Sequence, residues 1–285
     1  MMKNNSKGIL YVVGTPIGNL GDITYRAIET LKSVDIILAE DTRNTLKLLT
    51  HFEIKKTLIS YEKHSEQRKL NQVIEILDSG KNVALVSDAG MPLISDPGEN
   101  LVKYLRENDY KIVIIPGVTA LITGIVGSGI DSSRFTFEGF LSVSKKQRIS
   151  HLNSIKDETR TMIFYEAPHK LVYTLKDLYD ILGNRKICIA RELTKIHEEF
   201  KLITISEAID IIEQNGIKGE IVLIVEGINQ EEIDKKLLDE LNNISNIDLV
   251  KKYMTDGLNK KEAIKKVAKD KNINKNEVYK ECLDL

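Results

Sequence analysis

The chain has 285 residues, of which 42% are hydrophobic and 29% are charged, and its formal net charge is −1. This composition is typical of a soluble globular protein with room for two domains, and the near-neutral charge means that an anionic partner such as RNA must meet local basic patches. No apolar run approaches the roughly 20 residues that span a bilayer, and the first residues lack the apolar core of a signal peptide, so we expect a cytoplasmic protein with no membrane partner.

The first predicted elements are a strand over residues 9–13, a glycine-rich loop (GTPIGNLGD) and a helix over residues 23–32. The loop glycines do not have the GxGxxG spacing of a dinucleotide fold, and the chain contains no GxxxxGK[ST] motif. Pro16 also lacks the N–H that a phosphate cradle would use. The sequence therefore disfavours a nucleotide phosphate in this loop.

The second predicted strand, residues 34–39, ends in the charged side chains Glu40, Asp41 and Arg43. Such a cluster is either the edge of an active site or the salt-bridged start of the helix predicted over residues 44–50, because Asp is a common N-cap. Both interpretations remain open from the sequence.

A third short strand, residues 58–60, leads into a polar and partly basic segment, residues 61–69. A helix is predicted over residues 70–77, with Gly80 as its C-cap. The polar segment is interpreted as the solvated start of this helix.

The fourth predicted strand, residues 83–86, is the apolar run VALV and breaks into the loop SDAGMPLISDPG. In open α/β sheets, ligands bind outside the carboxyl ends of the strands. The loop has glycines for unusual φ angles, prolines for rigidity, and serines and aspartates for hydrogen bonds. It is either the floor of a small-molecule site or a stiff surface turn.

A fifth strand, residues 111–115, ends in the loop PGVTA and a helix rich in small residues. The recurrence of strand, loop and helix up to about residue 130 predicts a parallel sheet with right-handed crossovers. Its three glycine- and proline-rich loops are expected to line one cleft.

Beyond residue 131, strands become more frequent and helices fewer, which predicts a second α/β domain with a mixed sheet. Between its first two strands lies the basic segment 142–148 (SVSKKQR), which is either a phosphate-binding loop or a solvated one. The predicted strands are residues 135–139, 161–165, 186–190, 201–205 and 220–225, and the predicted helices are residues 171–182 and 207–215.

The C-terminal part begins with an acidic, helix-prone linker at residues 231–241 and then turns basic. Residues 250–285 contain ten lysines against six acidic residues. A helix is predicted over residues 260–270, between a helix before Gly257 and a last helix ending at Leu283. This pattern fits a small helix-turn-helix-like unit, and equally a solubilising tail or a dimer contact.

Cysteine and histidine spacing gives no sign of a metal centre. Cys188 and Cys282 lie far apart without CxxC spacing, which favours reduced, buried thiols. The five histidines show no ligand spacing such as HExxH, so no metal is expected.

Several long strings along the chain, from residue 8 to residue 227, carry a family resemblance. They resemble the bacterial small-subunit ribosomal RNA 2′-O-methyltransferase I family, which belongs to the tetrapyrrole methylase superfamily. The basic tail is similar to that family's helix-turn-helix extension. The strings are YVVGTPIGNLGDIT, ILAEDTRNTLKLL, YEKHSEQRK, ALVSDAGMPLISDPG, IPGVTA, FTFEGFL, FYEAPHKL and ARELTKIHEE.

The resemblance implies a two-domain α/β methylase that binds S-adenosyl-L-methionine between its domains and acts as a homodimer. The implied target is a cytidine ribose 2′-hydroxyl in the decoding region of 16S ribosomal RNA, free or within the small subunit. The implied segments are an N-terminal methylase domain at 1–128, a C-terminal methylase domain at 129–229, the acidic linker at 230–247 and the basic tail at 248–285. The implied cofactor contacts are Thr15, Pro16, Asp88, Ala89, Gly90, Met91, Pro116, Thr119, Ala120, Tyr165, Glu166, Ala167, Glu220, Ile221 and Val222.

Methyl transfer to a ribose hydroxyl is an in-line displacement, which requires alignment and assistance from a general base or a hydrogen-bond network. A lysine serves as the base only if its pKa is depressed, and a salt-bridged corner is an equal alternative for the ARELTK segment. A tetrapyrrole or corrinoid methylase and a non-catalytic RNA-binding module remain as rival functions. The catalytic candidates are Glu40, Asp41, Arg191, Glu192 and Lys195, and the RNA-binding candidates are Arg43, His64, Arg68, Lys145, Lys146, Arg148 and His169.

Overall fold

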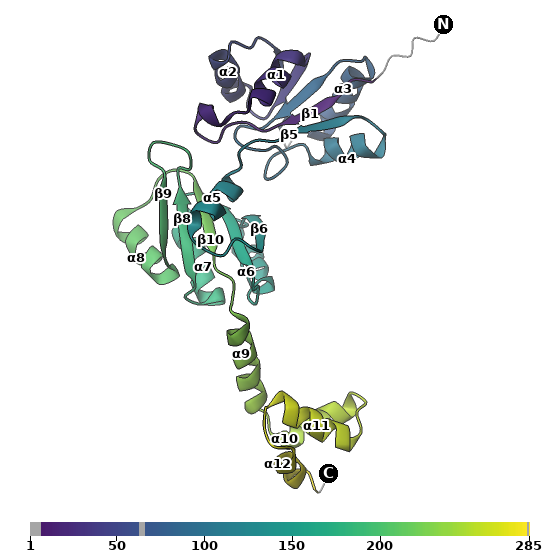
Figure 1. Cartoon of the computed structure of the whole chain (residues 1–285), viewed down its shortest axis with the longest axis vertical. Coiled ribbons are helices and arrows are strands. Elements are labelled where there is room, and N and C mark those ends of the chain that lie inside the picture. Colours follow the sequence, from purple (N-terminus) through teal and green to yellow (C-terminus); the bar gives the residue numbers. More distant parts are fainter. Residues whose placement is uncertain (1–6, 63–65, 284) are drawn as a thin grey trace. The chain divides into compact units, whose positions relative to one another are not determined.

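The computed structural model describes residues 7–62, 66–283 and 285. The chain divides into two compact units, which are considered separately. Unit 1 comprises Met1–Lys156 and Arg160–Glu226, and unit 2 comprises Asp157–Thr159 and Gly227–Leu285. Both sheets belong to unit 1, and unit 2 contains four helices among its described residues (Figure 1).

The first sheet is fully parallel, as the sequence predicts. Its order is β3 (Thr57–Ser60), β2 (Ile36–Ala39), β4 (Val83–Val86), β1 (Leu10–Val13) and β5 (Ile112–Ile115). Successive strand residues point to opposite faces, and helices cover both, which explains the continuous apolar strand sequences. The elements between the strands are α1 (Tyr25–Ser33), α2 (Thr42–His51), α3 (Glu66–Asp78) and α4 (Glu99–Glu107), with a short 3₁₀ turn at Leu20–Asp22.

Two apolar cores form, one on each face of this sheet. Leu85 of β4 lies in one core with Leu101 of α4, while Val86 lies in the other with Leu31 of α1. The sequence analysis did not place α4, since its start follows the long loop after β4. All parallel strands direct their carboxyl ends to one edge, which brings the predicted loops together there.

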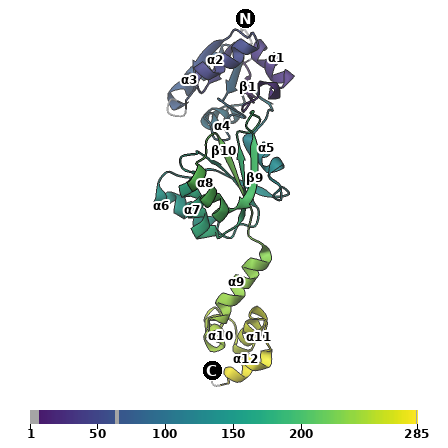
Figure 2. The same ribbon diagram turned by 90° about the vertical axis from the view of Figure 1, so that its left-hand side faces the viewer.

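The second sheet is mixed, again as predicted, with order β6, β7, β10, β8 and β9. Figure 2 shows three helices, α6, α7 and α8, on one side of it and α5 on the other. The strands are β6 (Phe135–Phe140), β7 (Thr161–Glu166), β8 (Lys186–Arg191), β9 (Glu199–Thr204) and β10 (Ile221–Val225), and the helices are α5 (Ala120–Ser128), α6 (Lys145–Ser154), α7 (Leu171–Leu182) and α8 (Ile205–Asn215).

Two element assignments in this half require correction. The basic segment 142–148 is not a loop throughout, because helix α6 begins at Lys145. The strand predicted over residues 201–205 is β9, which spans Glu199–Thr204. It ends at Thr204 because a capping box between Thr204 and Glu207 starts helix α8 there. Helix α5 packs on the second sheet through Leu121 and Ile125. The boundary between the two methylase domains, at residues 128 and 129, stays a prediction.

Unit 2 consists of α9 (Gln230–Asn242), α10 (Asn246–Thr255), α11 (Lys260–Asp270) and α12 (Lys275–Glu281). Helix α11 has the predicted bounds and begins with a capping box formed by Asn259 and Glu262. The last three helices enclose a separate small core that includes Val250, Ile264 and Cys282. Both cysteines are free and buried, which confirms that prediction. In the described part of the chain, no helix combines the length and apolarity required to traverse a bilayer.

Candidate functional site

The loops after β1 and β4 are joined by backbone hydrogen bonds. Thr15 and Gly90 form an isolated antiparallel bridge, with N···O distances of 2.9 and 3.0 Å. The buried Thr15 hydroxyl also donates to the carbonyl of Ser87 at 3.2 Å. Gly90 has a φ angle of +79°, which explains the glycine at this turn. Thr15 therefore fixes the central loop rather than offering its side chain to a ligand.

The loop after β5 lies against the same place through two glycines. A Cβ atom on Gly14 would lie only 2.8 Å from Cα of Gly117 and 2.7 Å from Sδ of Met91. The backbones of the first and third loops thus approach so closely that side chains are excluded at both glycines. The glycine pattern that fails the dinucleotide motif is explained by this contact.

Beside these loops is a cavity of about 450 Å³, which we call the donor cavity. The three glycine- and proline-rich loops at the carboxyl edge of the first sheet all contribute to its lining, as predicted. Residues of the second sheet complete the lining. Thr15, Pro16 and Pro116, which were expected to contact the cofactor, are absent from its described lining. Its lining residues are Ile17, Glu40, Asp88, Ala89, Gly90, Met91, Ile94, Ser95, Asp96, Thr119, Ala120, Phe140, Tyr165, Glu166, Ala167, Pro168, Leu193, Glu220, Ile221 and Val222.

The polar lining of the donor cavity is acidic. Its described lining contains carboxylate side chains and no lysine, arginine or histidine. Burial raises the pKa of Glu40, and the negative charges of Asp96 and Asp88 raise it further. Burial likewise raises the pKa of Asp96, despite a hydrogen bond from Ser87. The carboxylates of the described lining thus outnumber its cationic side chains, which favours a cationic ligand. The carboxylates belong to Glu40, Asp88, Asp96, Glu166 and Glu220.

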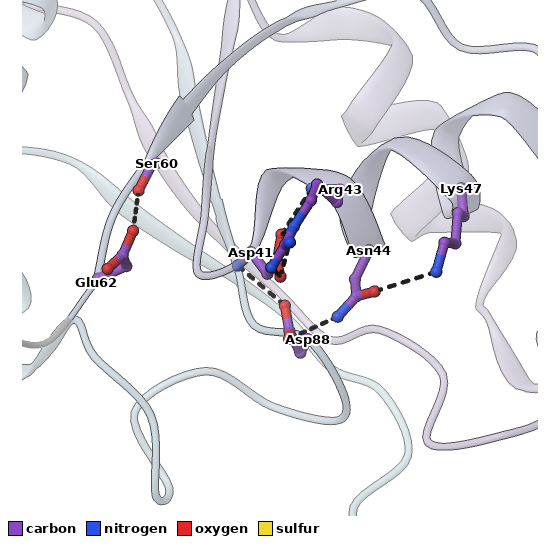
Figure 3. A network of polar contacts seen from close by, with 7 residues as sticks. All are labelled: Asp41, Arg43, Asn44, Lys47, Ser60, Glu62 and Asp88. Carbon is purple, nitrogen blue, oxygen red and sulfur yellow. Dashed lines mark hydrogen bonds and ion pairs between the residues drawn. The ribbon is translucent and has the colours of Figure 1, made fainter.

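Asp88 connects the central loop to the start of α2, as Figure 3 shows. One of its carboxylate oxygens accepts from N of Asp41 at 3.0 Å, and the other accepts from Nδ2 of Asn44 at 2.9 Å. In the same view, Asn44 also contacts Lys47, and Ser60 donates to Glu62 at 2.7 Å. Asp88 therefore both lines the cavity and holds a second loop in place.

Asp41 has the structural role of a helix cap. Its side chain accepts from N of Arg43 at 2.8 Å and from the Arg43 guanidinium at 2.6 Å (Figure 3). These hydrogen bonds lower the pKa of Asp41 to about 2. Of the adjacent acidic pair, only Glu40 lines the donor cavity.

A β-bulge shapes the aromatic wall of the donor cavity. The β6–β7 register shifts between Phe137 and Gly139, where Gly139 has a φ angle of +65°. The extra residue places both Phe137 and Phe140 edge-on against the Tyr165 ring, at centroid distances of 4.9 and 5.5 Å. The Tyr165 hydroxyl accepts from N of Leu121 at 3.1 Å, and burial raises its pKa. Tyr165 thereby joins helix α5 to the cavity wall.

Glu166 is a fixed part of the cavity lining. Its side chain is buried, and its two oxygens accept from N of Ala167 at 2.8 Å and from the Thr174 hydroxyl at 2.6 Å. Because both oxygens are occupied, Glu166 shapes the cavity instead of moving protons.

The corner between β8 and β9 has a salt-bridged network. Lys195 donates to Glu192 at 3.0 Å and to Glu220 at 2.9 Å, and N of Glu220 donates to Glu192 at 2.9 Å. Burial alone lowers the pKa of Lys195, but the two carboxylates outweigh it and leave the pKa raised. The pKa of Glu192 is lowered by the Glu220 N–H and by Lys195. Glu192 adopts a strained φ angle of +51° to make these contacts.

Arg191 extends away from the donor cavity. Its guanidinium donates to Glu199 at 3.0 Å and to the carbonyl of Lys218 at 3.4 Å, beside a separate surface cavity. The salt-bridged interpretation of ARELTK therefore describes Arg191 and Lys195 well, and Glu40 is the one catalytic candidate in the described lining of the donor cavity.

The RNA-binding candidates occupy different environments. Arg68, Lys145, Lys146 and His169 are exposed, and Arg43 extends into solvent beside Asp41. Arg148 is paired with Asp177 at 2.6 Å, and its side chain is only 14% exposed. His64 lies outside the described residues.

Several lining residues were not among the expected cofactor contacts. Ser95 and Asp96 were visible as hydrogen-bonding residues of the central loop, but nothing in the sequence showed that Asp96 points inward. Phe140 depends on the bulge, whose sequence signal is the glycine within FEGF. The omitted residues are Ile17, Ile94, Ser95, Asp96, Phe140, Pro168 and Leu193.

Comparison with known proteins decides the family. Residues 9–209 match the family model described as Tetrapyrrole (Corrin/Porphyrin) Methylases. The chain belongs to the tetrapyrrole methylase family. Methylases of this family take the methyl group from S-adenosyl-L-methionine, and this chain does the same.

Relatives of this methylase carry the name ribosomal RNA small subunit methyltransferase I. The one from Bacillus subtilis is 48% identical over 272 residues, which cover 95% of this chain and 93% of the relative. The one from Thermotoga maritima is 47% identical over 220 residues, which cover 77% of this chain but 99% of the relative. That relative thus has no counterpart for nearly a quarter of this chain.

Solved structures of the family agree with this methylase in fold. The methyltransferase CobJ aligns with a TM-score of 0.61 at 19% identity, covering 77% of this chain and 94% of that chain. Uroporphyrin III C-methyl transferase from Thermus thermophilus aligns with a TM-score of 0.56 at 17% identity, covering 77% and 97%. These similarities support the predicted two-sheet fold and no finer function.

Proposed function

We propose that this methylase transfers a methyl group from S-adenosyl-L-methionine to the ribose 2′-hydroxyl of a decoding-region cytidine in 16S ribosomal RNA, in the cytoplasm. The observation that carries the proposal is the donor cavity, whose described lining combines carboxylates with apolar side chains. The relatives named as ribosomal RNA methyltransferases supply the substrate class.

The residues of the donor cavity fit the cofactor. S-adenosyl-L-methionine carries a sulfonium and an ammonium against one carboxylate, so it is a net cation and is stabilised by carboxylates. When bound, it supplies an electrophilic methyl group. Asp88 and Asp96 would attract the cationic part, while Ile221, Val222 and Leu193 would cover the apolar surface. A nucleotide with a pyrophosphate does not fit this charge.

Glu40 is the proposed general base. A base needs a pKa near the working pH and contact with the reacting hydroxyl. Asp41 fails the first condition because its pKa is about 2, and Lys195 fails because its raised pKa keeps it protonated. Glu40 lines the cavity and has a raised pKa. It would accept the ribose proton, with assistance worth roughly 10²- to 10⁴-fold in rate.

The RNA is proposed to contact exposed basic side chains around the donor cavity and in unit 2. Lys145 and Lys146 occupy the first turn of α6, and α11 carries five lysines between residues 260 and 269. Such clusters bind phosphates through local charge, even though the whole chain is nearly neutral. Arg148 is not counted among these phosphate-binding side chains, since its Nε is paired with Asp177.

A second copy of the chain is the proposed partner of one apolar surface. Ile122 and Val126 of α5 and Leu202 of β9 are exposed, and the end of α5 lies beside Leu202. Exposed apolar side chains that gather on one surface are typical of an interface. We therefore propose a homodimer, tested by light scattering of the wild type and of Val126→Glu.

The test of the function is methyl transfer to defined substrates. We expect labelled methyl groups to enter 16S RNA or the small subunit, at a cytidine ribose located by mass spectrometry of ribonuclease fragments. Tetrapyrroles and corrinoids are the comparison substrates, although the carboxylates of uroporphyrin-like compounds are repelled by an acidic cavity. Label in a tetrapyrrole and none in RNA would overturn the proposal.

A further inference from the structure

A second, smaller cavity lies on the second sheet beside the donor cavity. It has a volume of about 210 Å³, and we call it the side cavity. Glu166 lines both cavities, so they adjoin at this residue. The other lining residues are Leu141, Ser142, Val143, Arg148, Lys170, Tyr173 and Thr174.

The inner end of the side cavity is rigid and polar. Glu166 is 4% exposed, and its hydrogen bonds to Thr174 and to N of Ala167 fix it in place. Arg148 is held by Asp177 through Nε at 2.6 Å, and its Nη1 donates to the carbonyl of Ser142 at 3.0 Å. Its Nη2 has no hydrogen-bond partner among the described residues. The Arg148 guanidinium is therefore a fixed cation in the lining of the side cavity.

The outer end of the side cavity is aromatic and cationic. Tyr173 is 69% exposed and Val143 is 75% exposed, although both line a cavity. Lys170 makes no side-chain hydrogen bond or ion pair with the described residues, and Lys145 follows Val143 closely in the chain. An exposed aromatic ring with nearby cations is the arrangement on which unpaired nucleobases stack in RNA-binding proteins.

We propose that the side cavity holds an unpaired nucleobase of the RNA substrate, adjacent to the ribose that reaches the donor cavity. This inference rests on the proposed function. The base stacks on Tyr173 and accepts a hydrogen bond from Nη2 of Arg148, while Lys170 contacts the neighbouring phosphate. Because Glu166 forms a shared wall, a base in the side cavity directs the attached ribose toward the donor cavity. The site thus selects an unstacked nucleotide over a paired one.

The experiment compares Tyr173→Ala with a matched control on the same helix. Tyr179 is also an exposed tyrosine of α7, but it lines neither cavity. We expect Tyr173→Ala to weaken the binding of a single-stranded oligoribonucleotide of the decoding region about tenfold or more, as lost base stacking does. Tyr173→Phe, which keeps the ring, and Tyr179→Ala should bind like the wild type. The affinity for S-adenosyl-L-methionine should not change in any variant.

A double-mutant cycle identifies the base. Oligoribonucleotides that lack the base of the target nucleotide, of its 5′ neighbour or of its 3′ neighbour are bound to the wild type and to Tyr173→Ala. Loss of the base that occupies the side cavity should weaken wild-type binding but have no further effect on Tyr173→Ala. Additive losses for all three oligoribonucleotides, or equal binding by Tyr173→Ala and Tyr179→Ala, would overturn the inference. Failure of the proposed function is distinct, since the wild type would then transfer no methyl group to any RNA.

Discussion

Exchange of Glu40 for glutamine is the sharpest test of the donor cavity. Glutamine has nearly the same shape, so Glu40→Gln removes a proton acceptor and one negative charge and leaves the lining otherwise unchanged. If Glu40 accepts the ribose proton, kcat should fall by roughly 10²- to 10⁴-fold, which corresponds to about 2.7–5.4 kcal/mol of transition-state free energy. The affinity for S-adenosyl-L-methionine should change much less, because Asp88 and Asp96 still line the cavity.

The pH dependence separates a base from a passive carboxylate. Burial and the charges of Asp96 and Asp88 raise the pKa of Glu40 above its ordinary value of 4.5. The wild-type kcat should therefore fall as the pH decreases through this raised pKa, and Glu40→Gln should lack that decrease. The ionised Glu40 also destabilises the fold at neutral pH, a cost that disappears as the pH falls through the raised pKa toward 4.5. Glu40→Gln should consequently melt at a higher temperature than the wild type at pH 7, with no difference below pH 4.5.

The assays are single-turnover methyl transfer across a pH series and thermal melting at two pH values. Asp41→Asn is the matched control, because Asp41 is the adjacent carboxylate and faces Arg43 instead of the cavity. It should keep the helix cap, because asparagine caps helices as well as aspartate does, and it should leave the melting temperature nearly unchanged and the pH profile of kcat in place. A Glu40→Gln variant with the wild-type kcat and pH profile would refute the role of Glu40 as the base.

Three further predictions follow from the loops and from unit 2. Asp88→Ala should weaken the affinity for S-adenosyl-L-methionine roughly 10- to 100-fold, as expected when a charged group is lost from a site; unchanged calorimetric binding would refute it. Gly14→Ala should destabilise the fold by about 1–3 kcal/mol, because the added Cβ would clash with Gly117. The control Gly21→Ala, in the same loop, should be tolerated. Denaturant unfolding measures the stability of both variants. Removal of residues 230–285 should leave the affinity for S-adenosyl-L-methionine intact, because the described core residues of unit 1 include none from unit 2. The same truncation should weaken salt-sensitive RNA binding in filter assays.

The fold was largely predictable because its strands are short apolar runs that end in turn residues. Strand β4 and its loop contain both signals within a few residues, and the parallel order follows from the helices between strands. The segment 142–148 was misassigned because its charged side chains suggested solvent, whereas Arg148 finds its partner Asp177 far along the chain. Such distant pairs leave no mark in local sequence.

The candidate site was predictable as a set of loops but not as a set of side-chain roles. Glu40 and Asp41 are adjacent acidic residues, yet one lines the donor cavity and the other caps a helix. Their opposite pKa shifts arise from the surroundings, burial beside Asp96 in one case and Arg43 in the other. The helix-start interpretation holds for Asp41, whereas an active-site role of Glu40 stays a proposal.

Charge separates the two ligands that this methylase must bring together. In the proposed function, the carboxylates of the donor cavity attract a cationic cofactor and repel the phosphates of RNA, so the phosphates stay outside the cavity. The exposed Lys145 and Lys146 attract those phosphates instead, on a helix that begins beside the side cavity. A ribose hydroxyl is the one uncharged nucleophile of the RNA backbone, and it is the group that can cross from a basic surface into an acidic cavity. The proposed cofactor site and the proposed sugar acceptor are therefore consistent with one another in charge.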